Sequence, residues 1–369
     1  MCKFFSGGTP SSTNKDFYDG NIPFIRSGEI HSCSTELHIS ESGLNSSSAK
    51  IVEQGDLLLA LYGATSGDIS ISKIKGAINQ AILCIRTNHD TFFLKSCWEK
   101  HCEKVLQTYL QGGQGNLSAE IVKSIKMSFP SCDEQKKISG FLTLIEERID
   151  TQRKIIEDLK KLMNAINNLL HDSLKDTQSF CFNELGNDYS GLTGKSSVDF
   201  GYGLPYISYL DVFRNNIVTD DYFDYVNVSE NEKQNVVKYG DLLFTLSSET
   251  PTEVGIGAIY LGKIKPLYLN SFCFGIHLSN QEHVYGPYLA YFVTSQYFRR
   301  TILPFAQGST RYNLMKSDFM KHKFCFPKVA MQREIYNALH TLSEKIENEE
   351  SYLDKYAEQK QYLLTQLFI

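Results

Sequence analysis

Two glycine-rich segments carry the side chains best suited to bind a polar ligand. QGGQGN (111–116) and QGSTRYN (307–313) each come just before a short stretch with helical spacing. Their amide, hydroxyl and guanidinium groups can donate hydrogen bonds to phosphate oxygens or to base edges. The candidate contact residues are Gln114, Asn116, Arg311, Tyr312 and Asn313. An ordinary hairpin or capping loop would use similar residue types, so the sequence leaves that alternative open.

Two lysine pairs form a second candidate for contact with phosphate groups. Lys73 and Lys75 are separated by one residue, and so are Lys263 and Lys265. Ammonium groups at these places suit the backbone phosphates of a nucleic acid. A solvated strand end would explain both pairs equally well.

Motifs for catalysis or metal binding are incomplete. GLTGKS (191–196) is similar to a phosphate loop, but Tyr189 stands where that motif requires a glycine. Cys97, His101 and Cys102 lie close together on an expected helix without a second ligand pair, which favours a core thiol cluster over zinc. No Ser/His/Asp signature and no HExxH motif is present. The sequence therefore predicts no catalytic residue and no metal ligand.

The elements that carry the candidate residues occur twice along the chain. GDLL at 55–58 recurs at 240–243, an offset of 185 residues, and the offset grows to 197 at Pro130 and Pro327. Between these shared pieces the copies differ: ATSGDISISKIK in the first copy stands against SSETPTEVGIGAIYLGKIK in the second. An internal repeat of this kind predicts two units with one framework and different variable segments. Chance divergence or two different specificities would each explain the difference.

Each copy is expected to mix strands and helices. In the first copy we predict strands in 21–30, 54–74 and 76–87, a helix over 92–110, and a loop, short helix and strand over 111–130. The second copy opens with FCFNELGNDYSGLTGKSS (180–197), of which the first copy keeps only FFSGGTPSS. About ten residues of an opening strand are missing by this comparison, which suggests a shortened N-terminus.

A long amphipathic helix is predicted after each copy. The apolar positions of the first helix repeat at heptad spacing, and adding 197 to each gives the seam of the second. The two seams are Ile138, Leu142, Ile145, Ile149, Gln152, Ile156, Leu159, Met163, Ile166 and Leu170, and Ile335, Leu339, Leu342, Ile346, Glu349, Leu353, Tyr356, Lys360, Leu363 and Leu367. Ser131 and Glu134 have the spacing of a capping box. Gln152 and Glu349 interrupt the seams at the same place, either to specify register or at a solvated edge.

Composition limits the class of protein. The 369 residues are 42% hydrophobic and carry a net charge of −5, and no apolar run is long enough for a membrane span. The nine cysteines form no CxxC pair, which favours a reducing cytoplasm. Basic and acidic residues are balanced in the first copy, with 12 of each in 1–130. A nucleic-acid reader with this balance needs local basic patches or a partner that supplies phosphate contacts.

The duplicated order of motifs resembles the specificity subunit of type I restriction–modification systems. The residues that carry the resemblance are IPFI, GDLLLALYGATSG, INQA, QGGQGNLS and FPSCDEQKKI in the first copy, and LPYI, GDLLFTLSSE, LNSF, QGSTRYNL and FPKVAMQREI in the second. The resemblance implies an α+β protein with two target recognition domains and an antiparallel coiled coil of two long helices. By this division the recognition domains are 1–130 and 177–327, and the helices 131–176 and 328–369.

The resemblance also implies a non-catalytic reader of double-stranded DNA. Each domain would read one half of a split target, and a helix of about 38 residues would extend ~57 Å, more than one turn of B-DNA. Methyltransferase subunits and an endonuclease/translocase subunit would be the partners, and they would hold S-adenosylmethionine, ATP and Mg. Two other classes remain open: an enzyme of unrecognised type, and a coiled-coil scaffold whose globular domains bind protein rather than DNA.

Overall fold

The computed structural model describes residues 2–110, 117–221, 223–279 and 282–368, which fold into two compact units. Unit 1 comprises residues 1–153 and 351–369, and unit 2 comprises residues 154–350. The division falls within both long helices, α4 (Cys132–Asp172) and α10 (Val329–Leu367). Each unit therefore consists of one globular part together with part of each helix.

Unit 1 is built on two four-stranded sheets and three short or medium helices. The first sheet is antiparallel, in the order β1 (Lys3–Ser6), β8 (Ile82–Arg86), β5 (Leu57–Ala60) and β6 (Ile69–Ile71). The second has the order β3 (Leu37–Ile39), β2 (Ile22–Ile25), β7 (Gly76–Ile78) and β4 (Lys50–Val52), with β2 and β7 parallel. The helices are α1 (Glu41–Asn45), α2 (Thr91–Leu110) and α3 (Ala119–Ser124). Strand β5 is buried along its whole length, as its run of apolar residues predicts.

Unit 2 repeats this framework and enlarges it. Its main sheet has the order β10 (Gly186–Ser190), β18 (Cys273–Leu278), β14 (Leu242–Thr245), β16 (Gly257–Tyr260) and β12 (Ile217–Val218). A second sheet contains β13 (Asp224–Val226), β11 (Phe200–Ile207) and β17 (Tyr268–Leu269). Two small sheets are β15 (Ser247–Ser248), β20 (Tyr312–Leu314) and β19 (Ala306–Gln307), and β21 (Lys323–Phe326) with β9 (Gln178–Cys181). The helices are α5 (Phe182–Leu185), α6 (Tyr209–Arg214), α7 (Leu289–Phe292), α8 (Gln296–Ile302) and α9 (Lys316–Lys321).

Strand pairing confirms the internal repeat residue by residue. Leu57 on β5 pairs with Ile85 on β8, and Leu242 on β14 pairs with Ile276 on β18. Leu57 and Leu242 are 185 residues apart, and Ile85 and Ile276 are 191 residues apart, which are the offsets of the repeat in the sequence. The aspartate of GDLL also bonds to the side chain at the equivalent position in both units. Arg86 donates to Asp56 at 2.6 Å, and the Nδ1 of His277 lies 2.8 Å from Asp241.

Two predictions about strands are wrong. Residues 76–87 form two strands, β7 and β8, because Asn79 makes a tight turn in which its Oδ1 accepts from the Ala81 amide at 3.1 Å. The strand expected before Pro130 is not formed at 126–129. Its counterpart in unit 2, β21, pairs with β9, whereas the described residues of unit 1 offer no partner strand to 126–129. A strand needs such a partner to satisfy its backbone groups.

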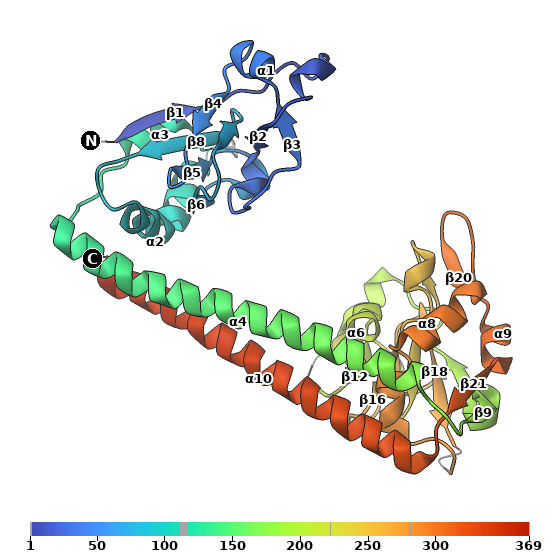
Figure 1. Ribbon diagram of the computed structural model, residues 1–369. Helices are drawn as coiled ribbons and strands as arrows, with labels where there is room; N and C mark the ends of the chain where they lie inside the picture. The colour runs from blue at the N-terminus through green and yellow to red at the C-terminus, as the bar shows by residue number, and fades with distance from the viewer. Residues whose placement is uncertain (1, 111–116, 222, 280–281, 369) are drawn as a thin grey trace. The chain divides into compact units, whose positions relative to one another are not determined.

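The long helices confirm the predicted seam. All seam positions are buried or half-buried, while the apolar off-seam residues Leu144 and Leu162 are 63% and 48% exposed. Gln152 and Glu349 are 4% and 8% exposed, which excludes a solvated edge for either. The helices run antiparallel within unit 1, where Leu142 of α4 packs in one cluster with Leu364 and Phe368 of α10 (Figure 1). Further along α4, Arg148 bonds to the earlier α10 residue Tyr356 at 2.9 Å.

A buried glutamine fixes the start of α10 to its own globular part. Gln332 is fully buried, and its Nε2 donates to the carbonyl oxygens of Pro327 at 2.8 Å and His283 at 2.9 Å. Its Oε1 accepts from the Tyr285 amide at 2.7 Å. All three partners are backbone groups, so the bonds constrain the main chain directly.

The start of α4 uses the equivalent glutamine, 197 residues earlier. Gln135 donates to the Pro130 carbonyl at 2.9 Å and accepts from the Asp90 amide at 3.3 Å. Ser131 caps the same helix, with its Oγ accepting from the Glu134 amide at 3.3 Å, as the capping spacing predicts. The Gln-x-x-Ile pattern in the sequence is therefore a buried hydrogen-bonding site followed by the first seam residue.

We predict that Leu142→Ala destabilises unit 1 by about 2–5 kcal/mol, because it leaves a cavity between α4, α10 and α2. Trp98 is the only tryptophan of the chain and is buried in unit 1, so its fluorescence during urea unfolding reports on this unit. The matched control is Leu144→Ala, two residues away on the exposed face, which should change the free energy of unfolding by less than about 0.5 kcal/mol. Equal effects of the two substitutions would contradict the buried seam.

Candidate nucleic-acid interface

The second glycine-rich segment forms an exposed β-hairpin on unit 2. Strands β19 and β20 pair antiparallel, with Gln307 opposite Asn313, and residues 308–311 form the tip. Gly308 has φ +150°, and a Cβ on it would lie 2.0 Å from the Arg311 carbonyl oxygen. Only glycine fits this turn. The side chains from Gln307 to Arg311 and that of Asn313 are exposed, and Tyr312 is half-buried.

The variable segment of unit 2 lies directly beside this hairpin. Strand β15 pairs with β20, so that Ser247 lies opposite Asn313 and Ser248 opposite Tyr312. Glu249 and Thr250, which follow β15, are exposed. The structure thus joins two features that the sequence shows separately, the residues that differ between the copies and the glycine-rich loop.

Arg299 on α8 holds the variable segment in place. Its guanidinium donates to the carbonyl oxygens of Thr252 at 2.6 Å, Gly255 at 2.8 Å and Val254 at 2.9 Å. Burial lowers the pKa of this guanidinium, which nevertheless remains a cation near neutral pH. In unit 1 the counterpart carbonyl, that of Gly67, accepts from the Trp98 indole at 2.7 Å. Sequence reasoning missed both anchors, because neither residue belongs to a motif.

Arg311 is the strongest candidate for contact with a ligand. Its guanidinium lies 5.0 Å from the ring centroid of Phe272, a half-exposed aromatic side chain on the neighbouring turn. Within the described ranges no carboxylate pairs with it. A guanidinium stacked on a ring keeps its edge donors available for bidentate contacts to phosphate or guanine.

The predicted lysine pair of unit 2 is not part of the hairpin surface. Lys263 and Lys265 follow β16, next to the start of β14, whereas β15 and the hairpin lie at the other end of β14. Both side chains are exposed, and the backbone amide of Lys263 donates to Asp220 at 2.8 Å. The two groups of candidates therefore occupy opposite ends of one strand pair.

Gln114 and Asn116 lie outside the described residues. The residue that follows them, Leu117, donates from its amide to the Leu61 carbonyl at 3.0 Å, just as Leu314 donates to Leu246 at 2.8 Å in unit 2. Leu117 and Leu314, which follow the two glycine-rich segments in the sequence, are thus anchored to equivalent points of their units.

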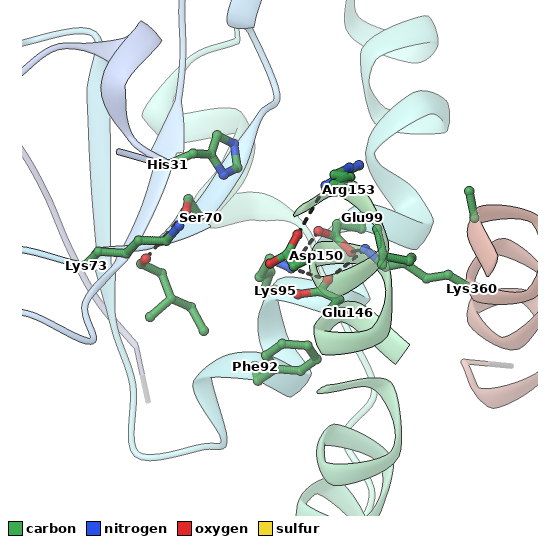
Figure 2. A pocket seen from close by; sticks show the side chains of 13 residues that line it. His31, Ser70, Lys73, Phe92, Lys95, Glu99, Glu146, Asp150, Arg153 and Lys360 are labelled. Carbon is green, nitrogen blue, oxygen red and sulfur yellow. Dashed lines mark hydrogen bonds and ion pairs between the residues drawn. The ribbon is translucent and has the colours of Figure 1, made fainter. Parts of the chain in front are cut away.

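The first-unit lysines differ from each other. Lys75 forms an ion pair with Glu53 at 2.9 Å, and both side chains are exposed. Lys73 lines a polar pocket of 510 Å³ in unit 1. Figure 2 shows Lys73 and His31 on one side of this pocket and charged residues of α2, α4 and α10 on the other.

That pocket contains a network of four charged groups that the sequence does not reveal. Lys95 lies 2.6 Å from Glu146 and 2.9 Å from Glu99, and Lys360 lies 2.7 Å from Glu146 and 3.0 Å from Glu99. Only the Lys95–Glu99 pair, at i and i+4, has a sequence signal. Burial alone raises the pKa of Glu146, but hydrogen bonds from Lys360 and Lys95 outweigh it and lower that pKa below 4.5.

Residues of the incomplete motifs make ordinary structural contacts. Lys195 of the loop that is similar to a phosphate loop pairs with Glu232 at 2.6 Å. Cys97 is buried in the core, and Cys102 donates to the Gly67 carbonyl. No group of three or more His, Cys, Asp or Glu in the described part of the chain could hold a metal ion. None of its helices is long and apolar enough to cross a membrane.

A repeated framework, an exposed hairpin beside a variable segment, and paired long helices define a two-module recognition protein. The family model of the type I restriction modification DNA specificity domain matches residues 1–161 and 175–355. The chain belongs to this family, and its role is in DNA sequence specificity.

Individual relatives and solved structures agree with this assignment. The MjaVIII specificity subunit of Methanocaldococcus jannaschii is 24% identical over 326 residues, covering 80% of this chain and 74% of the relative. The HindI specificity subunit of Haemophilus influenzae is 26% identical over 161 residues, 40% of this chain and 35% of the relative. The S subunit from M. genitalium superposes with a TM-score of 0.57 at 14% identity, covering 100% of this chain and 94% of that one. A chain of a type I R-M system gives 0.61 at 13% identity, with 100% and 97% covered. The structural likeness shows a shared fold.

We predict that Glu146→Gln destabilises unit 1 by about 1–3 kcal/mol at pH 7, because two lysines lose their charged partner. Since the pKa of Glu146 is lowered in the folded chain, its stabilisation is present above pH 4.5 and is lost as the pH falls through the folded pKa. The difference from wild type should therefore shrink in acid, as followed by Trp98 fluorescence. Glu147→Gln, on the exposed face of the same helix, is the control. A difference that persists unchanged at low pH would contradict the role of charge.

Proposed function

We propose that each unit reads one half of a split DNA sequence and that α4 and α10 hold the two readers and dock methyltransferase subunits. In this proposal the chain catalyses no reaction. The methyltransferase and the endonuclease/translocase subunits hold S-adenosylmethionine, ATP and Mg, and the complex acts on double-stranded DNA in the cytoplasm.

The observation that carries the proposal is the position of the unit 2 hairpin. A two-stranded ribbon fits the major groove of B-DNA, where each base pair presents a distinct pattern of donors and acceptors. The exposed hairpin offers Arg311, Asn313 and neighbouring hydroxyl groups, and β15 of the variable segment pairs with its strand β20. Residues that differ between the units thus adjoin the ribbon that would enter the groove.

The outer face of α4 supports the docking of partner subunits. Ile155, Leu162 and Leu169 follow one another at seven-residue intervals and are 39%, 48% and 68% exposed. Exposed apolar residues on one face of a helix suit a protein partner. The chain has a net charge of −5, which by itself does not favour binding to DNA phosphates. A partner with a basic surface, bound on this face of α4, would supply the phosphate contacts that the chain lacks.

We predict that Arg311→Ala in the assembled methyltransferase complex weakens binding to the target. If Arg311 reads a base, one half of the target loses about 1–3 kcal/mol of discrimination, while a phosphate contact would weaken all sequences and flatten the salt dependence. Binding assays with single-base variants of the target, at two salt concentrations, separate these results. Arg300→Ala, an exposed arginine of α8 bonded to Gln296, should leave the recognised sequence unchanged. Unchanged affinity and target in Arg311→Ala would mean that the hairpin is structural.

We also predict that the unit 2 reader can be exchanged as a block. Residues 178–326 run from β9 to its partner β21, so a replacement taken from a relative would contain both strands of this pair. Cells that carry the chimera and its methyltransferase should methylate a target altered in one half, with the other half and the spacer unchanged. Methylome sequencing measures this outcome. A change in both halves, or in spacer length alone, would refute the assignment of one half to each unit.

A further inference from the structure

Phe272 of unit 2 carries an aromatic ring, 49% exposed, in a turn that does not require one. The turn joins β17 to β18, and the Oδ1 of Asn270 accepts from the Phe272 amide at 2.9 Å. The Phe272 carbonyl accepts from the Leu246 amide at 2.8 Å. The counterpart in unit 1, 191 residues earlier, is Ala81, whose amide and carbonyl make the equivalent two bonds at 3.1 and 2.8 Å. An alanine thus supports the same turn, so the ring is not needed to form it.

The backbone that carries the ring is tied to the hairpin and to the variable segment. Leu246, which bonds to the Phe272 carbonyl, directly precedes β15. The Leu246 carbonyl in turn accepts from the amide of Leu314 on β20 at 2.8 Å. Main-chain hydrogen bonds therefore fix the position of the ring relative to the hairpin, and the Arg311 guanidinium lies 5.0 Å from the ring centroid. The ring gives a fixed support to a cation at an otherwise exposed loop tip.

A nearby cation shows that stacking alone does not leave a side chain available. Lys316 lies 5.0 Å from the ring centroid of Phe274, but it also forms an ion pair with Asp188. Arg311 stacks on Phe272 in the same way and keeps its charge unpaired within the part of the chain that the structure describes. The donors at the edge of its guanidinium therefore remain free for a ligand.

A guanidinium held in one place is better suited to a base than to a phosphate group. A flexible ammonium group is sufficient to bind phosphate as a point charge. A bidentate contact instead needs two parallel N–H groups with a defined direction. Guanine presents N7 and O6 as a pair of acceptors in the major groove, and arginine is the commonest partner of this pair.

We propose that Phe272 positions Arg311 to read a guanine, so that the half of the target read by unit 2 contains a G·C base pair, which presupposes the proposed function of unit 2 as a DNA reader. Phe272 acts through Arg311 and is a positioning residue. Because Ala81 stands in place of the ring in unit 1, the two units differ in this device while the turn that carries it is the same.

The first test asks whether Arg311 contacts a guanine. Methylome sequencing gives the split target, and exchange of residues 178–326 assigns one half of it to unit 2. Within that half, replacing the contacted guanine with 7-deazaguanine removes the N7 acceptor and should weaken binding of the assembled methyltransferase complex by about 5-fold or more. The same replacement should have little effect on the complex that carries Arg311→Ala.

The outcomes of this test separate the two proposals. A half-site without a G·C pair, or equal losses in both complexes at every guanine, would overturn the reading of guanine by Arg311 and leave the two-reader function intact. The absence of any split target would contradict the proposed function itself, and the guanine contact with it.

The second test concerns the ring. Phe272→Ala should reduce discrimination at the same base pair by about 5-fold or more, and Phe272→Tyr, which keeps the ring, should restore it. The double variant with Arg311→Ala should bind no worse than Arg311→Ala alone, because the ring acts through the guanidinium. Leu303→Ala, which truncates a 43% exposed side chain just before β19, is the control and should leave discrimination unchanged. Additive losses in the double variant, or no rescue by tyrosine, would refute the positioning role.

Discussion

The architecture depends on one buried side chain at the start of each long helix. Gln135 and Gln332 are 1% and 0% exposed, and a buried amide must satisfy both its donor and its acceptor groups. Both bond to backbone atoms of the segment before the helix and of a preceding loop, and Gln135 also lies 3.4 Å from the Nδ1 of His89. Each glutamine therefore fixes the direction in which the helix leaves its globular part. Since both helices begin in the same way, the repeat extends from strand pairing to the junction between domain and helix.

Much of this organisation can be predicted from the sequence, because it depends on periodic burial. The heptad spacing identified the seam, and the repeated GDLL and Gln-x-x-Ile pieces identified equivalent positions in the two units. Other contacts depend on residues distant in sequence and leave no local pattern. Lys95, Glu146 and Lys360 meet only because α2, α4 and α10 pack together in unit 1. The strand expected at 126–129 fails for a related reason, because a strand forms only where a partner exists.

The candidate interface was predicted in part. The sequence singled out Arg311 and Asn313 by their residue types, and the structure places both on an exposed hairpin. It could not show that β15 lies beside them, because that pairing joins segments about 65 residues apart. The lysines at 263 and 265 matched the expected residue type, yet they lie at the far end of the same strand pair. Residue type and spacing identify possible hydrogen-bond donors. Which of these donors lie together can be seen only in the folded structure.

The way in which the variable segment is held explains how the units can differ and keep one framework. Arg299 binds three carbonyl oxygens of residues 252–255, and Trp98 binds the carbonyl of Gly67 in unit 1. Main-chain carbonyls are present whatever side chains the segment carries, so these anchors tolerate substitution there. The pairing of β15 with β20 likewise uses backbone groups. Side chains on the exposed face can therefore change the ligand that is recognised without weakening the bonds that position them.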